Sequence, residues 1–70
     1  MKNKIQYGIC AYRSNGERVY FVSSEYAENM TPYAVSLAAK YDSKQLAKVK
    51  MEKLKNHWVG LTGWAVFQDI

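Results

Sequence analysis

The sequence has a single cysteine and a single histidine among its 70 residues, and it has no long apolar run. A lone thiol at Cys10 excludes an internal disulfide and is typical of proteins in reducing compartments. One thiol and one imidazole also fall short of the usual ligands of a zinc site, so no metal or other cofactor is expected. The apolar stretches are too short for a membrane span or a signal peptide. These absences predict a cytoplasmic protein that does not enter the membrane.

The composition predicts a folded chain with one domain. Apolar residues make up 49% of the sequence and aromatic residues 14%, which excludes a disordered chain. A chain of this length forms one small domain, residues 1–70, near the lower limit at which a core without disulfides is stable. The sequence contains no repeat, linker or low-complexity segment.

Positive charge is concentrated in one segment. Residues 40–57 contain six lysines against Asp42 and Glu52, which accounts for the whole net charge of +4. Such a segment suits an anionic partner, either nucleic acid or an acidic protein surface. A net charge of this size is also what solubility alone favours, so the charge does not choose between these partners.

The N-terminal part of the chain predicts a β-hairpin. Two extended runs, residues 5–12 and 18–22, flank the sequence Ser14-Asn15-Gly16-Glu17. Asn-Gly suits the two central positions of a type I′ turn, whose twist matches that of the strands it joins. A two-residue turn would place Ala11 opposite Tyr20 and would set the register of the hairpin.

The predicted register sorts the side chains of the hairpin onto two faces. The face expected to be buried holds Ile5, Tyr7, Ile9, Ala11, Tyr20 and Val22. The other face holds Gln6, Gly8, Cys10, Tyr12, Val19 and Phe21. If only one face is buried, the apolar groups of Tyr12, Val19 and Phe21 stay exposed, and we expect these three residues to bind a partner.

The middle of the chain has more than one interpretation. The polar segment 23–31, followed by Pro32, is typical of a connecting loop. Residues 33–41 alternate in polarity, which predicts a short strand. Thr31-Pro32 also suits the start of a helix, and the alanines that follow favour a helix. We expect the strand, because Asp42 offers a separate helix start.

A helix is predicted from Asp42 to His57. Asp42 followed by Gln45 resembles a capping box, and the segment contains no helix breaker. At about 100° per residue, the side expected to pack on the sheet consists of Leu46, Ala47, Met51, Leu54 and Trp58. Outside that side lies a set that we call the lysine stripe, namely Lys44, Lys48 and Lys55.

The order of these elements predicts the fold class. Residues 64–68 alternate in polarity and form the last expected strand. The expected fold is α+β, with a three- or four-stranded, mostly antiparallel sheet in the order ββ(β)αβ and one amphipathic helix packed on one face. An edge strand or an uncovered sheet face would also allow a homodimer.

Few residues suggest catalysis. Cys10 and His57 could in principle act as nucleophile and base, but no third residue to orient them can be identified, so no enzymatic activity is expected. Trp58 and Trp64 flank a turn and could anchor a partner. In a chain with so little apolar volume, they more readily cap the core.

Two sets of basic residues are candidate binding sites. Arg13 and Arg18 flank the hairpin turn and should face each other. A bound anion would stabilise this like-charge pair, although in most proteins both side chains of such a pair point into water. The lysine stripe could contact phosphates or a carboxylate-rich protein surface. The sequence lacks the pattern of RNA-recognition motifs, so protein contact is the preferred interpretation and nucleic-acid binding the alternative.

The hairpin, the tryptophan-bearing last strand and the Ala39-Lys40-Tyr41-Asp42-Ser43 entry into a lysine-rich helix resemble very short accessory proteins of phages and mobile elements of Gram-positive bacteria. The resemblance is one of pattern, covers most of the chain and transfers no residue role. It implies a small non-enzymatic protein that binds and modulates a host macromolecule, as anti-CRISPR proteins and inhibitors of replication or transcription do. Many inhibitors of DNA-handling nucleases are acidic. A basic chain would instead approach an acidic protein surface or the nucleic acid itself.

Overall fold

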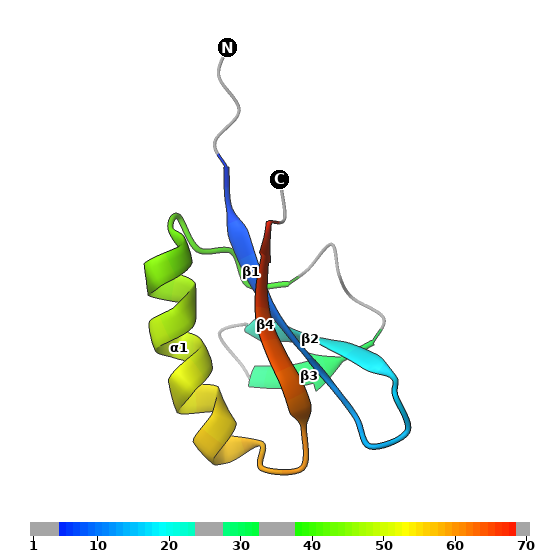
Figure 1. Cartoon of the computed structure of the whole chain (residues 1–70). Coiled ribbons are helices and arrows are strands. Elements are labelled where there is room, and N and C mark those ends of the chain that lie inside the picture. The colour runs from blue at the N-terminus through cyan, green and yellow to red at the C-terminus, as the bar shows by residue number, and fades with distance from the viewer. Residues whose placement is uncertain (1–4, 24–27, 33–37, 69–70) are drawn as a thin grey trace.

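A computed structural model of the protein describes residues 5–23, 28–32 and 38–68. These residues form β1 (Tyr7–Tyr12), β2 (Arg18–Ser23), β3 (Glu28–Thr31), α1 (Lys44–His57) and β4 (Thr62–Gln68). The strands make one antiparallel sheet in the order β3-β2-β1-β4, and α1 packs on one of its faces (Figure 1). The predicted α+β class, with a mostly antiparallel sheet and one helix, is confirmed.

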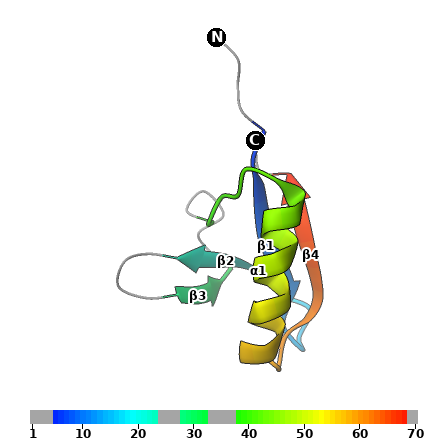
Figure 2. The ribbon, with the colours of Figure 1, turned by 90° about the vertical axis from the view of Figure 1, so that its left-hand side faces the viewer.

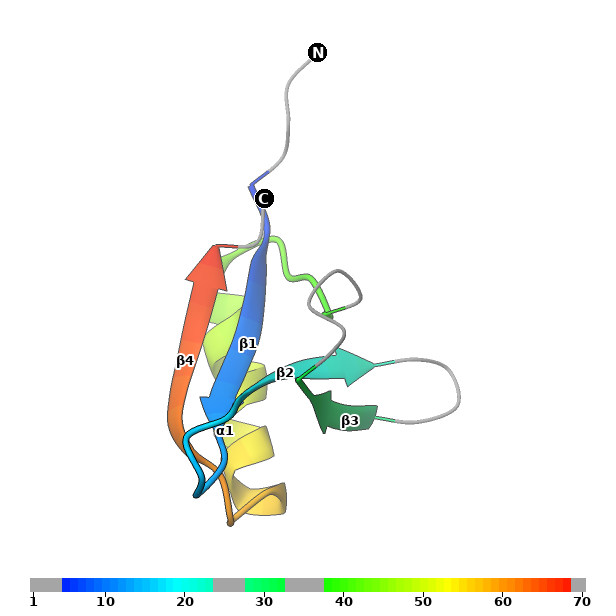
Figure 3. The same ribbon diagram turned by 90° about the vertical axis from the view of Figure 1, so that its right-hand side faces the viewer.

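The sheet turns sharply between β1 and β2. Only residues 10–12 of β1 pair with β2, and beyond them the β2–β3 ribbon runs across the direction of β1 and β4 (Figures 2 and 3). Segment 38–41 fills the space that this turn opens. Tyr7 and Tyr41 exchange two backbone hydrogen bonds of 2.9 and 2.8 Å, and the N–H of Ala39 donates to the C=O of Phe21 at 3.0 Å.

The turn between β1 and β2 differs from the predicted one. The N–H of Gly16 donates to the C=O of Arg13 at 2.9 Å, and the N–H of Arg13 donates to the C=O of Glu17 at 2.8 Å. Gly16 has a φ of 88°, while no non-glycine residue in the described part of the chain has a positive φ. This is a type I turn followed by a glycine bulge, with one more loop residue than a type I′ turn.

The extra loop residue exchanges the two faces of β2, because a shift of one position turns every side chain over. Val19 lies opposite Ala11, and Tyr20 lies opposite Cys10. Val19 and Phe21, which the sequence placed on an exposed face, are fully buried under α1. The predicted register is therefore wrong, and these two side chains are not exposed to a partner. Tyr20 takes their place on the face away from the helix.

The core lies between α1 and the sheet. Its members are at most 8% exposed and are Ile9, Ala11, Val19, Phe21, Met30, Ala47, Met51 and Leu54. Trp58 and Trp64 pack against these side chains, and the ring of Trp58 meets that of Phe21 edge to face at 6.4 Å. Leu46, predicted to pack on the sheet, is 56% exposed, because it lies about 100° around the helix from Ala47.

Helix α1 begins after Ser43, which is its N-cap in place of the predicted Asp42. The Ser43 Oγ accepts a hydrogen bond from the N–H of Leu46 at 3.1 Å. Asp42 instead accepts a hydrogen bond from the Gln6 side chain at 3.4 Å. The predicted helix over residues 42–57 is thus correct except for its first two residues.

The segment between β2 and α1 also departs from the prediction. Residues 28–31 form β3, although segment 23–31 is expected to be a loop. β3 buries only Met30, and one buried side chain gives no alternation that a sequence pattern could reveal. Of the predicted strand 33–41, residues 33–37 lie outside the described residues. Residues 38–41 form only the isolated bridge between Tyr41 and Tyr7.

Candidate functional site

The sheet face opposite α1 carries an arginine among aromatic rings. The Arg18 guanidinium lies 5.3 Å from the centroid of the Tyr20 ring and 5.6 Å from that of Phe67. These two rings meet edge to face with their centroids 5.6 Å apart. Tyr12, which is 38% exposed, pairs with Arg18 across β1 and β2. We call Tyr12, Arg18, Tyr20 and Phe67 the open-face cluster.

Two glycines let the rings of the cluster lie close to the backbone. The Phe67 ring covers Gly8, where a Cβ atom would come within 2.6 Å of its Cζ. Gly63 lies beneath the ring of Tyr12, where a Cβ atom would be 2.9 Å from Cδ1. Gly63 has a φ of 63° and belongs to an irregularity in the pairing of β1 with β4. Because Gly8 and Gly63 have no side chains, the rings of Phe67 and Tyr12 can lie close to the backbone of the sheet.

A hydrogen bond to the sheet holds the guanidinium in place. Arg18 Nη2 donates to the Sγ of Cys10 at 3.5 Å, and Cys10 is only 2% exposed. This hydrogen bond is the main cause that raises the pKa of Arg18 above its ordinary value. Arginine is always protonated in proteins, and the contacts with Cys10 and the two rings orient the exposed Arg18 guanidinium before any partner binds, which lowers the entropy cost of binding.

Arg13 and Arg18 do not lie opposite each other, although the sequence predicts that they do. Arg13 pairs across the turn with Glu17 and makes an ion pair with its carboxylate at 2.6 Å. Arg18 lies opposite Tyr12 and faces the aromatic rings. The extra loop residue shifts the pairing so that the two arginines no longer face each other, which corrects that prediction.

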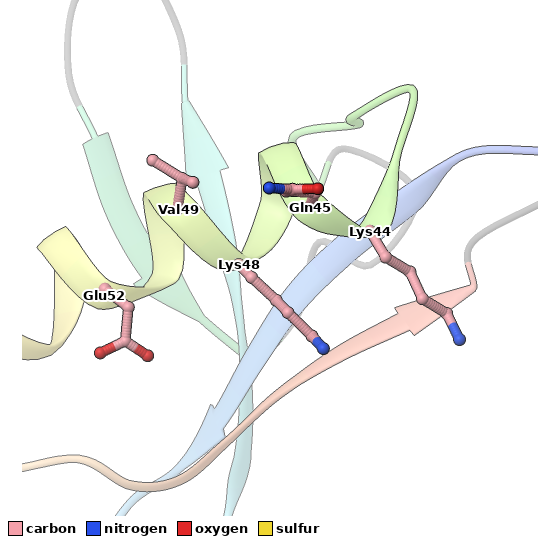
Figure 4. A pocket seen from close by; sticks show the side chains of 5 residues that line it. All are labelled: Lys44, Gln45, Lys48, Val49 and Glu52. Carbon is pink, nitrogen blue, oxygen red and sulfur yellow. The ribbon is translucent and has the colours of Figure 1, made fainter.

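The lysine stripe is exposed, and it lies on the flank of α1 next to β4. On the opposite flank, Lys50 makes an ion pair with Glu28 of β3 at 3.2 Å. The helical period places the stripe about 120–160° around the helix from Lys50. Figure 4 shows Lys44 and Lys48 extending from α1 toward β4, and Lys44 Nζ lies 6.0 Å from the centroid of the Tyr7 ring on β1.

A shallow hollow lies on the outer side of α1 (Figure 4). It has a volume of about 610 Å³, and its lining side chains are Lys44, Gln45, Lys48, Val49 and Glu52. Because one helix supplies all of them, the hollow is open space between exposed side chains and has no opposing wall. It does not resemble the enclosed pockets that bind small molecules.

The structure separates the only thiol from the only imidazole. Cys10 lies on the open face of the sheet. His57 is at the end of α1, where the centroid of its ring lies 4.4 Å from that of the Trp58 ring. The part of the chain that the structure describes contains no cluster of three or more His, Cys, Asp or Glu side chains suited to a metal ion. None of its helices combines the length and the apolar character needed to span a membrane.

Two of the four members of the open-face cluster, Tyr12 and Arg18, are also candidate binding residues in the sequence. The predicted register places Tyr20 in the core, and the sequence pattern indicates no binding role for Phe67. The signal that could have found Phe67 is Gly8, since a glycine inside a strand often marks the close approach of another group.

Comparisons of the chain with protein-family models, curated proteins and solved structures found no match.

Proposed function

We propose that the chain is a non-enzymatic binding protein that contacts a protein partner through the open-face cluster. The observation that carries this proposal is the Arg18 guanidinium held over the rings of Tyr20 and Phe67, on the face that α1 leaves uncovered. Arginine and tyrosine are enriched among the residues that contribute most to protein interfaces. The partner surface that fits presents a carboxylate to Arg18, surrounded by apolar groups for the rings.

Single-stranded nucleic acid is the other partner that aromatic and cationic side chains attract. Such a site needs its stacking rings and its phosphate-binding cations along one groove. In this chain the rings lie on the open face, while the lysine stripe lies on the helix that covers the other face. Arg18 also lies over the Tyr20 and Phe67 rings, where it competes with a base for the same faces. Both features favour a protein partner.

The resemblance to small accessory proteins of phages and mobile elements supports the same kind of activity. Steric blocking of a host enzyme requires an interface and no catalytic group, and an anti-CRISPR or a similar inhibitor works in this way. A cytoplasmic host enzyme with an acidic surface is the partner class that we propose. The single buried thiol of Cys10 favours that compartment.

Affinity capture from nuclease-treated lysates of Gram-positive bacteria tests the proposal. Tagged wild-type chain is compared with Arg18→Glu and with Lys53→Glu, which makes the same change of charge at an exposed position of α1. We expect a protein that wild type and Lys53→Glu retain and that Arg18→Glu loses. Equal retention by all three chains, or retention that occurs only in a parallel lysate without nuclease treatment, would overturn the proposal.

A further inference from the structure

The described strands form a sheet whose two edges differ in how well they are protected against pairing with another strand. β3 has four residues, carries Glu28 in an ion pair with Lys50, and is followed at once by Pro32. Short length, charge and a nearby proline are features that prevent another strand from adding to an edge. β4 has seven residues, Thr62–Gln68, and none of them is charged or is proline. Within the described residues, β4 therefore lacks the features that protect the edge of β3.

The hydrogen bonds of β1 show which backbone groups of β4 face outward. Tyr7 exchanges both of its bonds with Tyr41, so the N–H and C=O of Tyr7 point away from β4. Bonded and non-bonded positions alternate along an antiparallel pair. Gly8 is therefore the residue that bonds to β4, and its partner there is Phe67.

The same alternation turns Val66 outward. Val66 lies opposite Ile9, one residue away from the bonded pair, so its N–H and C=O point to the outer edge. No strand among residues 5–23, 28–32 and 38–68 lies beyond that edge. The Val66 side chain packs against the core, which fixes the orientation of the strand. These two backbone groups thus have no strand partner within the described residues.

The lysine stripe runs along the same side of the molecule. Figure 2 looks onto α1 and has β4 on one side of the helix and the β2–β3 ribbon on the other. Lys50 makes its ion pair with Glu28 on the β3 side of the helix. Figure 4 shows Lys44 and Lys48 extending toward β4. Lys55 makes an ion pair with Glu52 of the same helix at 3.0 Å, whereas Lys48 has no ion-pair partner within the described residues. The edge of β4 therefore lies beside three lysines, one of which is paired with a carboxylate.

We infer that the outer edge of β4, together with the lysine stripe, docks an acidic, extended segment of a partner protein, which adds to the sheet as a further strand. The backbone of that segment bonds to the N–H and C=O of Val66. Every second side chain of the segment lies on the helix side of the sheet, where carboxylates meet the lysine stripe. This docking uses backbone groups of β4 and side chains of α1, so it does not require the side chains of the open-face cluster, although Phe67 belongs to the same strand.

A second copy of the chain fits the same edge less well. Two β4 strands paired antiparallel around a two-fold axis would bring both helices to one face of the joined sheet. The lysine stripes of the two copies would then flank the same new strand pair, and like charges across it oppose association. An acidic segment replaces this repulsion with attraction, so charge selects it as the occupant.

A peptide titration followed by NMR tests the inference. The probe is Glu-Val-Glu-Val-Glu-Val-Glu, and its matched control is the same peptide with lysine in place of glutamate. We expect the acidic peptide alone to bind the ¹⁵N-labelled chain and to slow the hydrogen exchange of the Val66 amide. Lys44→Gln, Lys48→Gln and Lys55→Gln together should weaken binding about tenfold, while Lys53→Gln leaves it unchanged.

A second peptide isolates the backbone contribution without changing the protein. Two versions of the acidic peptide are made, in which N-methyl groups block either the odd-numbered or the even-numbered amides. In one version the blocked amides are those that would bond to β4, and we expect that version not to bind. Absence of binding by the unmethylated acidic peptide, or equal binding of both charge forms, would overturn the inference. Protection of Val66 that grows with protein concentration alone would assign the edge to a second copy. Tighter binding of oligothymidylate to the lysine stripe would assign the stripe to nucleic acid.

Discussion

The ring of Phe67 lies so close over Gly8 that a Cβ atom at residue 8 would be 2.6 Å from Cζ. The two residues are paired across β1 and β4, and the same ring meets that of Tyr20 at 5.6 Å. Phe67 therefore cannot rise from the sheet without changing its contact with Tyr20. The missing side chain of Gly8 determines the geometry of the open-face cluster.

Gly8→Ala should destabilise the protein by about 1–3 kcal/mol, because the added methyl group overlaps the Phe67 ring. Urea unfolding measures this change. Gly60→Ala is the matched control, since a Cβ atom there meets nothing within 4 Å, and its effect should stay within about 0.5 kcal/mol. A Gly8→Ala variant as stable as Gly60→Ala would show that the ring does not occupy this position.

The sequence predicted where the hairpin turns but not how. Asn15-Gly16 is compatible with a two-residue type I′ turn and with the observed three-residue loop, and both use a glycine with positive φ. The two differ by one residue, which is enough to exchange the faces of β2. For this reason the predicted register exposes Val19 and Phe21 and buries Tyr20, whereas the structure buries Val19 and Phe21. The register depends on packing against α1, which the local sequence does not contain.

Longer patterns were more informative than short ones. The helix spans enough turns for its period to identify Ala47, Met51 and Leu54 as core and the lysine stripe as exposed, and the structure agrees. Its N-cap was misplaced because Asp42 and Ser43 are both good caps and are adjacent. In the candidate site, the residue types of Tyr12 and Arg18 are enough to suggest a binding role. Phe67 lies near them only because β1 pairs with β4.

The two leucines of α1 should respond differently to truncation. Leu54 is 3% exposed, so Leu54→Ala should cost about 2–5 kcal/mol of unfolding free energy. Leu46 is 56% exposed, and Leu46→Ala should cost no more than about 0.5 kcal/mol. The same substitution in the same helix cancels differences in helix propensity. Similar losses in urea unfolding at both sites would contradict the placement of Leu46 outside the core.

Alkaline pH should destabilise the fold through Tyr41. Burial, with a smaller contribution from the charge of Glu28, raises the pKa of Tyr41 above its ordinary value of 10.0. Folding thus favours the neutral phenol, so its contribution is complete below pH 10.0 and is lost as the pH rises through the higher pKa of the folded state. Above pH 10.0, the unfolding free energy of wild type should fall more steeply than that of Tyr41→Phe. Parallel pH profiles would contradict this role.

The affinity of wild-type and variant chains for the purified, captured partner tests the role of the open-face cluster most directly. Isothermal titration should show that Arg18→Ala weakens binding by about thirtyfold or more, as expected for a central interface residue. Lys53→Ala, at an exposed position of α1, should change the dissociation constant by less than about threefold. A partner that binds Arg18→Ala and Lys53→Ala equally well would contradict the central claim, because its interface would then lie elsewhere on the chain.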